Sequence, residues 1–158
     1  QLAPQLRADP RVCVMEGCNA RGLSRGDIGT VDIVVMDVSF ISQALLYPAV
    51  CDILREGGDF ISLIKPQFEV GREHIGGGGI VRDRRAREAA VLHLLETAAD
   101  FGLAARSLIR SPIEGGDGNI EYLALFTAAG SVQKLPDGWE RRIKEVSGED
   151  KKCCTDSE

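Results

Sequence analysis

Two short runs of apolar residues, each followed by a charged residue, are the clearest pattern in the chain. Val31–Met36 precedes Asp37, and Phe60–Ile64 precedes Lys65. Continuous apolar runs of this length, separated by a helical pattern, are typical of buried parallel strands joined by a crossover helix. Ligands bind beyond the carboxyl ends of the strands in an open parallel sheet. The pattern therefore predicts that Asp37 and Lys65 lie at one binding edge.

The rest of the pattern alternates between strands and helices. A helix is expected over Ser42–Arg55, and a longer one begins after Asp83, a suitable N-cap, and runs to Phe101. The other expected strands are Val12–Met15, Leu103–Ile109 and Ile120–Ala128. This alternation is typical of an α/β layered domain with a mostly parallel sheet.

The link between the last two expected strands sets the direction of the final one. It is short and rich in glycine, serine and proline, so it can close a hairpin but cannot hold the usual crossover helix. The final strand should therefore run antiparallel. Its start, which carries Glu121, would then lie at the same edge as Asp37 and Lys65.

The composition changes after Gly130. We expect a folded domain over residues 1–129, followed by a charged and largely disordered C-terminal tail over residues 130–158. A short helix near Trp139–Val146 is the one element expected within that tail.

Bulk composition narrows the functional classes. The chain has 158 residues, of which 44% are hydrophobic and 27% charged, as in an ordinary globular domain. Its apolar runs are too short for a membrane helix, so no membrane partner is expected. The net charge of −5 argues against a broad surface that coats nucleic acid, although a local basic groove is compatible with it. The five cysteines form no C-x-x-C pair and the two histidines lack metal-ligand spacing, which favours reduced thiols in a cytoplasmic protein without a metal site.

A lysine between two carboxylates has two interpretations. Lys65 can belong to a partly buried ion-pair network that holds strand ends together. It can instead be a general base that removes a proton from a hydroxyl nucleophile, with Asp37 and Glu121 orienting it. Two nearby carboxylates favour the charged ammonium, which weakens a lysine as a base.

A loop with four consecutive glycines, Gly76–Gly79, follows the second central strand and is flanked by arginines. No Gly-Lys-Ser/Thr follows the glycines, so a mobile lid fits better than a phosphate loop. The arginines form either a patch that contacts RNA phosphates or a solvated helix face. The candidates for RNA binding are Arg72, Arg82, Arg84 and Arg85.

Four motifs in this order carry a family resemblance: DVSFIS, IKPQFEVGRE, GGIVRD and SPIEGGDGNIEYL. They resemble the hemolysin A-type (TlyA) ribosomal-RNA 2′-O-methyltransferases, which are similar to the FtsJ-like RNA ribose methyltransferases. The resemblance runs from Gln1 to about Thr127. It implies a Rossmann-like fold, S-adenosyl-L-methionine as cofactor, and a Lys-Asp-Lys-Glu catalytic set. Asp37 matches the aspartate of that set, Lys65 the second lysine and Glu121 the glutamate.

The resemblance also implies a cofactor site and a substrate. Glu16 and Asn19, in the segment MEGCNAR, match a strand end beside the cofactor's adenosine, so the expected cofactor-binding residues are Glu16, Asn19 and Asp37. A plain polar loop cap is the competing interpretation of the first two. Family members methylate cytidine ribose in rRNA, so the expected partner is rRNA or a ribosomal subunit.

Three parts of the family pattern have no match: an N-terminal S4 domain, the first catalytic lysine and the glycine-rich cofactor turn. We therefore expect a sheet truncated at its N-terminal side. The missing lysine also puts the activity of the isolated chain in question. The alternative function is a non-catalytic module that binds RNA or the ribosome.

Overall fold

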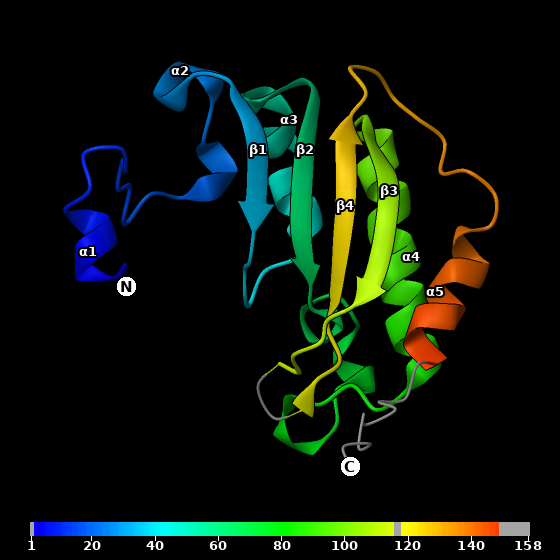
Figure 1. Cartoon of the computed structure of the whole chain (residues 1–158). Coiled ribbons are helices and arrows are strands. Elements are labelled where there is room, and N and C mark those ends of the chain that lie inside the picture. The colour runs from blue at the N-terminus through cyan, green and yellow to red at the C-terminus, as the bar shows by residue number, and fades with distance from the viewer. Residues whose placement is uncertain (1, 116–117, 149–158) are drawn as a thin grey trace, which may run out of the picture.

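One mixed sheet organises the fold, in a computed structural model that describes residues 2–115 and 118–148. In spatial order the strands are β1 (Val31–Met36), β2 (Leu54–Ile64), β4 (Tyr122–Ala128) and β3 (Leu103–Arg110). β1 and β2 pair in parallel, whereas β4 runs antiparallel to both β2 and β3. Three strands therefore share one direction and β4 opposes them (Figure 1). This confirms the predicted α/β sheet, mostly parallel with an antiparallel final strand.

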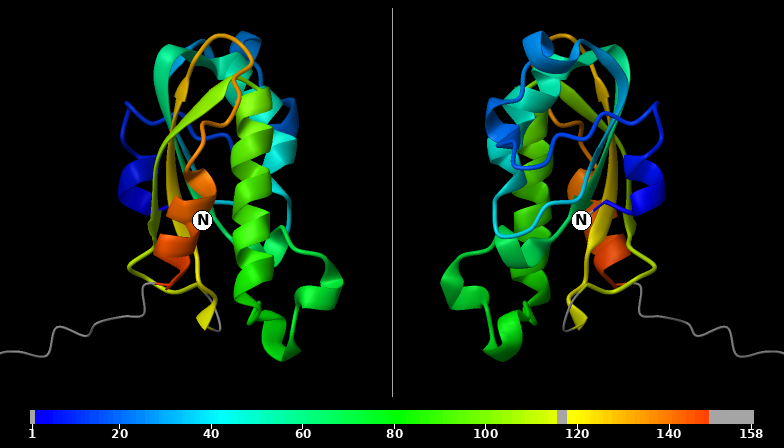
Figure 2. Two further views of the ribbon diagram at one scale, coloured as in Figure 1. Left: turned by 90° about the vertical axis from the view of Figure 1, so that its right-hand side faces the viewer. Right: turned by 90° about the vertical axis from the view of Figure 1, so that its left-hand side faces the viewer.

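The longer helices lie on one side of this sheet. α3 (Tyr47–Ile53) follows the linker after β1, and α4 (Arg84–Asp100) packs on β3. α5 (Trp139–Gly148) lies against α4 and β3 (Figure 2). Two short helices, α1 (Pro4–Arg7) and α2 (Arg25–Ile28), precede the sheet.

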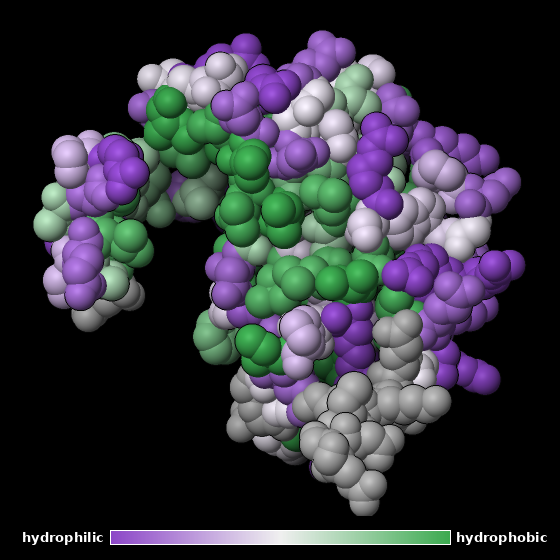
Figure 3. Space-filling model, viewed as in Figure 1, coloured by the Kyte–Doolittle hydropathy of each residue, from purple (hydrophilic) through white to green (hydrophobic). Residues whose placement is uncertain are grey.

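The core forms between the sheet and these helices. Phe60 and Phe126 are fully buried neighbours on β2 and β4, and their ring centroids lie 5.3 Å apart. Side chains alternate along a strand, so the adjacent residues point to the opposite face. There Val35 of β1 pairs in register with Ile61 of β2, and Val35 is 73% exposed. An apolar band follows this uncovered face (Figure 3).

Two local predictions were wrong. Val12–Met15 is irregular chain, because a strand is stable only when it pairs and none of the described strands pairs with this segment. The helix expected to reach Arg55 ends at Ile53, and β2 already begins at Leu54. The start of β2 pairs irregularly with β1, because the β1–β2 register shifts between Val31 and Ile33.

The described part of the expected tail is more ordered than predicted. Its helix extends over Trp139–Gly148, and Ile143 and Val146 are each 1% exposed against the core. Two apolar side chains one turn apart thus dock the predicted short helix onto α4. Residues 149–158, where the rest of the tail prediction falls, lie outside the described residues.

Candidate active site

The strand register brings the three predicted reactive residues to one edge of the sheet. Met36 pairs with Ser62, so Asp37 follows β1 just where β2 approaches its own end. Ile64 pairs with Tyr122, so Lys65 follows β2 where Glu121 precedes β4. Strand direction and register together make these three residues neighbours, as the sequence pattern predicted.

Lys65 and Asp37 form a close ion pair. The Lys65 Nζ lies 2.6 Å from Asp37 Oδ1, with the lysine side chain 14% exposed and the aspartate side chain 64% exposed. The same ammonium also donates a hydrogen bond of 3.2 Å to Ser39 Oγ. Two of the three N–H groups are thus used by residues that follow β1, and the amine is held in place by both.

Glu121 approaches the same place from β4 and is nearly buried, with 6% of its surface exposed. Its Oε1 accepts a hydrogen bond of 3.1 Å from Gln67 Nε2. Among the described residues it makes no ion pair with Lys65, but both line one cleft of about 570 Å³. The other residues that line this cleft are Ser39, Phe40, Gln67, Phe68, Ile75, Gly78, Gly79 and Asn119.

An aromatic pair forms one wall of the cleft. Phe40 is 89% exposed, and its ring centroid lies 4.9 Å from that of Phe68. Its backbone has φ of 62°, in the left-handed region that bulky side chains rarely adopt. A strained and exposed aromatic residue beside an ion pair is typical of a functional site rather than of a core.

A buried polar network beneath the cleft fixes the linker after β1 to the turn after β2. The Glu69 carboxylate accepts hydrogen bonds from Ser42 Oγ at 2.7 Å and from the backbone N of Gln43 at 2.9 Å. The buried Gln43 side chain in turn donates to the Leu63 carbonyl oxygen. Burial raises the pKa of Glu69, although these hydrogen bonds oppose that shift. The network thus joins the chain segments that follow Asp37 and Lys65.

The glycine loop lies over the other side of the cleft. Asn119 Nδ2 donates to the Gly79 carbonyl oxygen at 3.0 Å, and Asn119 Oδ1 accepts from the Val81 backbone N at 3.1 Å. Gly78 and Gly79 each have φ of 78°, a conformation that glycine adopts at little cost. Asn119 thus joins the end of this loop to the start of β4, and mobility of the loop stays a prediction.

Two of the three predicted cofactor residues, Glu16 and Asn19, lie in the N-terminal segment and have local partners. Glu16 Oε1 is 2.6 Å from Arg7 Nη2, and Asn19 Oδ1 accepts from the Arg21 backbone N at 3.1 Å. Within residues 2–115 and 118–148, no hydrogen bond or ion pair joins either residue to Asp37 or Lys65. Their cofactor role stays a prediction.

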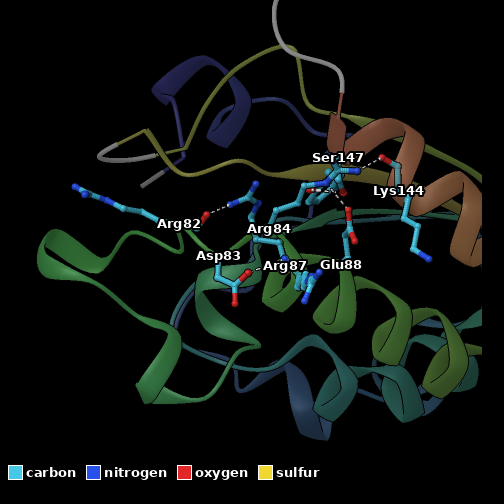
Figure 4. A network of polar contacts seen from close by, with 9 residues as sticks. Arg82, Asp83, Arg84, Arg87, Glu88, Lys144 and Ser147 are labelled. Carbon is cyan, nitrogen blue, oxygen red and sulfur yellow. Dashed lines mark hydrogen bonds and ion pairs between the residues drawn. The ribbon is translucent and has the colours of Figure 1, made fainter.

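The predicted RNA-binding arginines have two different environments. Arg84 bonds Glu88 on α4 and donates to the Lys144 carbonyl oxygen of α5 at 2.8 Å (Figure 4). Arg82 extends away from this network in the same view. Arg72, Arg82 and Arg85 are exposed and make no ion pair with another residue of the described chain. Their contact with RNA stays a prediction.

Sequence reasoning missed Ser39 and Gln67, which bond Lys65 and Glu121 respectively. Each lies two residues after a predicted reactive residue, Asp37 or Lys65. A polar residue two positions after a reactive residue at a strand end is the sequence feature that could have indicated both.

The described residues hold no helix that is both long and apolar enough to cross a bilayer. They also hold no group of three or more histidine, cysteine or carboxylate side chains arranged to bind a metal ion.

A family model and several known proteins match most of this chain. The family model described as FtsJ-like methyltransferase matches residues 1–127. The chain is 42% identical over 150 residues to the 16S/23S rRNA (cytidine-2'-O)-methyltransferase TlyA of Mycobacterium tuberculosis, covering 92% of this chain and 56% of that protein. It is 38% identical over 128 residues to hemolysin A of Brachyspira hyodysenteriae, covering 80% of this chain and 53% of that protein.

A solved structure described as "Putative hemolysin from Streptococcus thermophilus" superposes with a TM-score of 0.86 at 43% identity, covering 93% of this chain and 53% of the other. The chain thus spans about half the length of the curated relatives it matches. These matches confirm the resemblance read from the four motifs. The chain belongs to the FtsJ-like methyltransferase family.

Proposed function

We propose that this chain carries the reaction centre of an S-adenosyl-L-methionine-dependent methyltransferase that acts on the ribose 2′-hydroxyl of rRNA, in the cytoplasm. The observation that carries the proposal is the Lys65–Asp37 pair at 2.6 Å, whose lysine lines a cleft together with Glu121. A structural ion pair needs no cleft, whereas a base that acts on a bulky substrate does. The cytidine named for the M. tuberculosis relative is the proposed target nucleoside.

The exposed carboxylate of Asp37 suits the proposed cofactor, because S-adenosyl-L-methionine carries a positive sulfonium and a carboxylate attracts it. With the cofactor bound, the sulfonium supplies an electrophilic methyl group. Asp37 would hold it on the β1 side, with Glu16 and Asn19 as further proposed contacts.

Lys65 and its partners perform the proposed proton chemistry. The substrate hydroxyl would lie beside Lys65 Nζ. In its neutral form, this amine would accept the proton that the hydroxyl loses as the oxygen bonds the methyl carbon, while the bond from that carbon to the sulfonium sulfur breaks and leaves a neutral thioether. Asp37 and Ser39 hold the amine in one direction, and Asp37 stabilises the ammonium that forms. Most of the rate enhancement then comes from alignment of the hydroxyl.

The exposed arginines supply the proposed contacts to RNA. Arg72 and Arg82 flank the glycine loop at the cleft, and Arg85 lies in the first turn of α4. Arginine without a carboxylate partner is available to a phosphate. We assign Arg84 a lesser part, because it already bonds α5.

The test is transfer of tritium-labelled methyl groups from S-adenosyl-L-methionine to rRNA. It is run with the full chain and with a chimera in which this chain replaces the matching part of the M. tuberculosis relative. A 2′-O-methyl group blocks alkaline cleavage of the adjacent phosphodiester, so the label is expected in alkali-stable dinucleotides.

The unaltered relative serves as the positive control, and thermal melting confirms that the chimera folds. Label recovered in mononucleotides would contradict ribose methylation. A folded chimera that retains rRNA but transfers no methyl group would instead support the non-catalytic binding module.

A further inference from the structure

We infer that Gln67 is a positioning residue that fixes the Glu121 carboxylate for methyl transfer; this role rests on the proposed function. Gln67 was not among the reactive residues that the sequence indicated. It follows Lys65 and Pro66 in the turn after β2, and its side chain lines the cleft together with Lys65 and Glu121.

The first argument is the surroundings of Glu121. The residue is 6% exposed, and a carboxylate withdrawn from water needs hydrogen-bond donors in compensation. The donor that the structure provides to Oε1 is the Gln67 amide, at 3.1 Å, while Lys65 is turned to Asp37 and Ser39. Gln67 is therefore the polar contact that sets the direction of this carboxylate.

The second argument is steric. A Cβ atom placed on Gly115 would lie 2.1 Å from Glu121 Oε1. A side chain at position 115 would therefore collide with the carboxylate unless Glu121 moved, so the loop before β4 lies directly against it. Glu121 thus lies between this loop and the Gln67 amide.

The third argument is the orientation of the Gln67 amide. Its Oε1 is buried and has no hydrogen-bond partner in the described part of the chain. A buried unpaired carbonyl oxygen is costly. An ionised carboxylate only accepts hydrogen bonds, so turning the amide over would place two acceptors against each other. Glu121 therefore determines the orientation of the amide, and the Gln67 carbonyl oxygen is left buried without a hydrogen bond. A side chain that only filled space would have no reason to accept this energetic cost.

The functional consequence concerns alignment. Displacements of about 1 Å from the reactive geometry can lower an enzymatic rate by about 100-fold. Without the amide, the Glu121 carboxylate would be free to turn toward Lys65 or solvent. Gln67 therefore acts through Glu121 and does not itself touch the reacting atoms.

The test measures single-turnover methyl transfer across a pH series for Gln67→Leu and Gln67→Glu, in the full chain and in the chimera. Gln67→Leu keeps the bulk and removes the donor, so its rate is expected to fall about 10- to 100-fold at every pH. Gln67→Glu places two carboxylates together, which repel when both are ionised. Its rate relative to wild type is expected to recover as the pH is lowered, because one shared proton restores an O–H···O⁻ hydrogen bond.

The matched control is Gln133→Leu, since Gln133 donates its amide to Ser131 on the surface, and no change in rate is expected. Thermal melting separates loss of fold from loss of alignment. Equal rates for folded Gln67→Leu and wild type would overturn the inference, as would a constant ratio of the Gln67→Glu and wild-type rates across the pH series. Lys65→Ala, assayed in parallel, distinguishes the two proposals. If this variant retains activity, the proposed function itself is wrong. If it loses activity while Gln67→Leu stays active, only the inference about Gln67 is wrong.

Discussion

Two ion pairs in this molecule have the same length and different surroundings. The Lys65–Asp37 and Arg84–Glu88 pairs both bring nitrogen and oxygen to 2.6 Å. Lys65 is 14% exposed and lines a cleft, whereas the Arg84 side chain is 51% exposed and also bonds the backbone of α5. The nitrogen–oxygen distance alone therefore does not separate the pair proposed to be reactive from a pair within one helix.

The origin of the partners does distinguish them. Arg84 and Glu88 are one helical turn apart, a spacing that commonly stabilises helices. Lys65 and Asp37 come from separate strands and meet through the sheet register. We expect substitutions at the first pair to change stability and substitutions at the second to change rate.

The largest of these expected effects is that of Asp37→Asn. Asparagine preserves the shape but removes the charge that orients the Lys65 side chain and is proposed to attract the sulfonium of the cofactor, so the rate of methyl transfer should fall by about 100-fold or more. The aspartate is largely exposed, so the free energy of unfolding should change by less than about 1 kcal/mol. Single-turnover rates and urea denaturation check the two halves. A rate near that of wild type would place Asp37 outside the reaction centre.

Arg84→Ala should lower stability and leave the rate of methyl transfer nearly unchanged. It removes the hydrogen bond to the Lys144 carbonyl oxygen and should lower the free energy of unfolding by about 1 to 2 kcal/mol. Glu88→Ala is the matched control, with an expected loss below about 1 kcal/mol because only the ion pair is removed. Urea denaturation measures both. At saturating rRNA the methyl-transfer rate per folded molecule should change little, because Arg84 has only a lesser part in the proposed RNA binding. A large fall in rate for Arg84→Ala would mean that the α4–α5 junction contributes to the reaction.

Glu69→Gln should have the smallest effect, confined to the pH dependence of stability. Burial raises the pKa of Glu69 above its ordinary value of 4.5, which applies in the unfolded state. Between pH 4.5 and the raised pKa, the folded state therefore holds a proton that the unfolded state has lost. Wild-type stability should therefore fall as the pH rises through that window. Glutamine cannot titrate, so the variant should lack this part of the slope in urea denaturation from pH 4 to 8. Identical slopes would show that Glu69 is not the group responsible.

Much of the fold could be predicted from the sequence, because apolar periodicity determines which strands are buried. Val31–Met36 was predicted with the bounds it has, and the short link before Glu121 correctly gave the antiparallel β4. The early start of β2 escaped prediction, since polar residues and glycines before Phe60 gave no strand signal. α5 is ordered because Ile143 and Val146 pack against α4, and local composition does not encode this tertiary contact.

The candidate site was predictable to the extent that it follows from strand ends. Asp37 and Lys65 met as expected, because parallel strands align their carboxyl ends. Arg84 was grouped with the exposed arginines because local sequence does not indicate that Lys144, which lies 60 residues later, provides a carbonyl acceptor. Gln67 was missed because its contact with Glu121 spans 54 residues.

The central claim is that Lys65 serves chemistry rather than the fold, and Lys65→Ala tests it most directly. Single-turnover methyl transfer to rRNA should be measured for this variant beside its midpoint of urea denaturation. The account predicts a rate at least about 100-fold below wild type, because the proton acceptor is gone, with the midpoint nearly unchanged. A variant that keeps its rate, or one that loses activity only because it unfolds, would contradict the account.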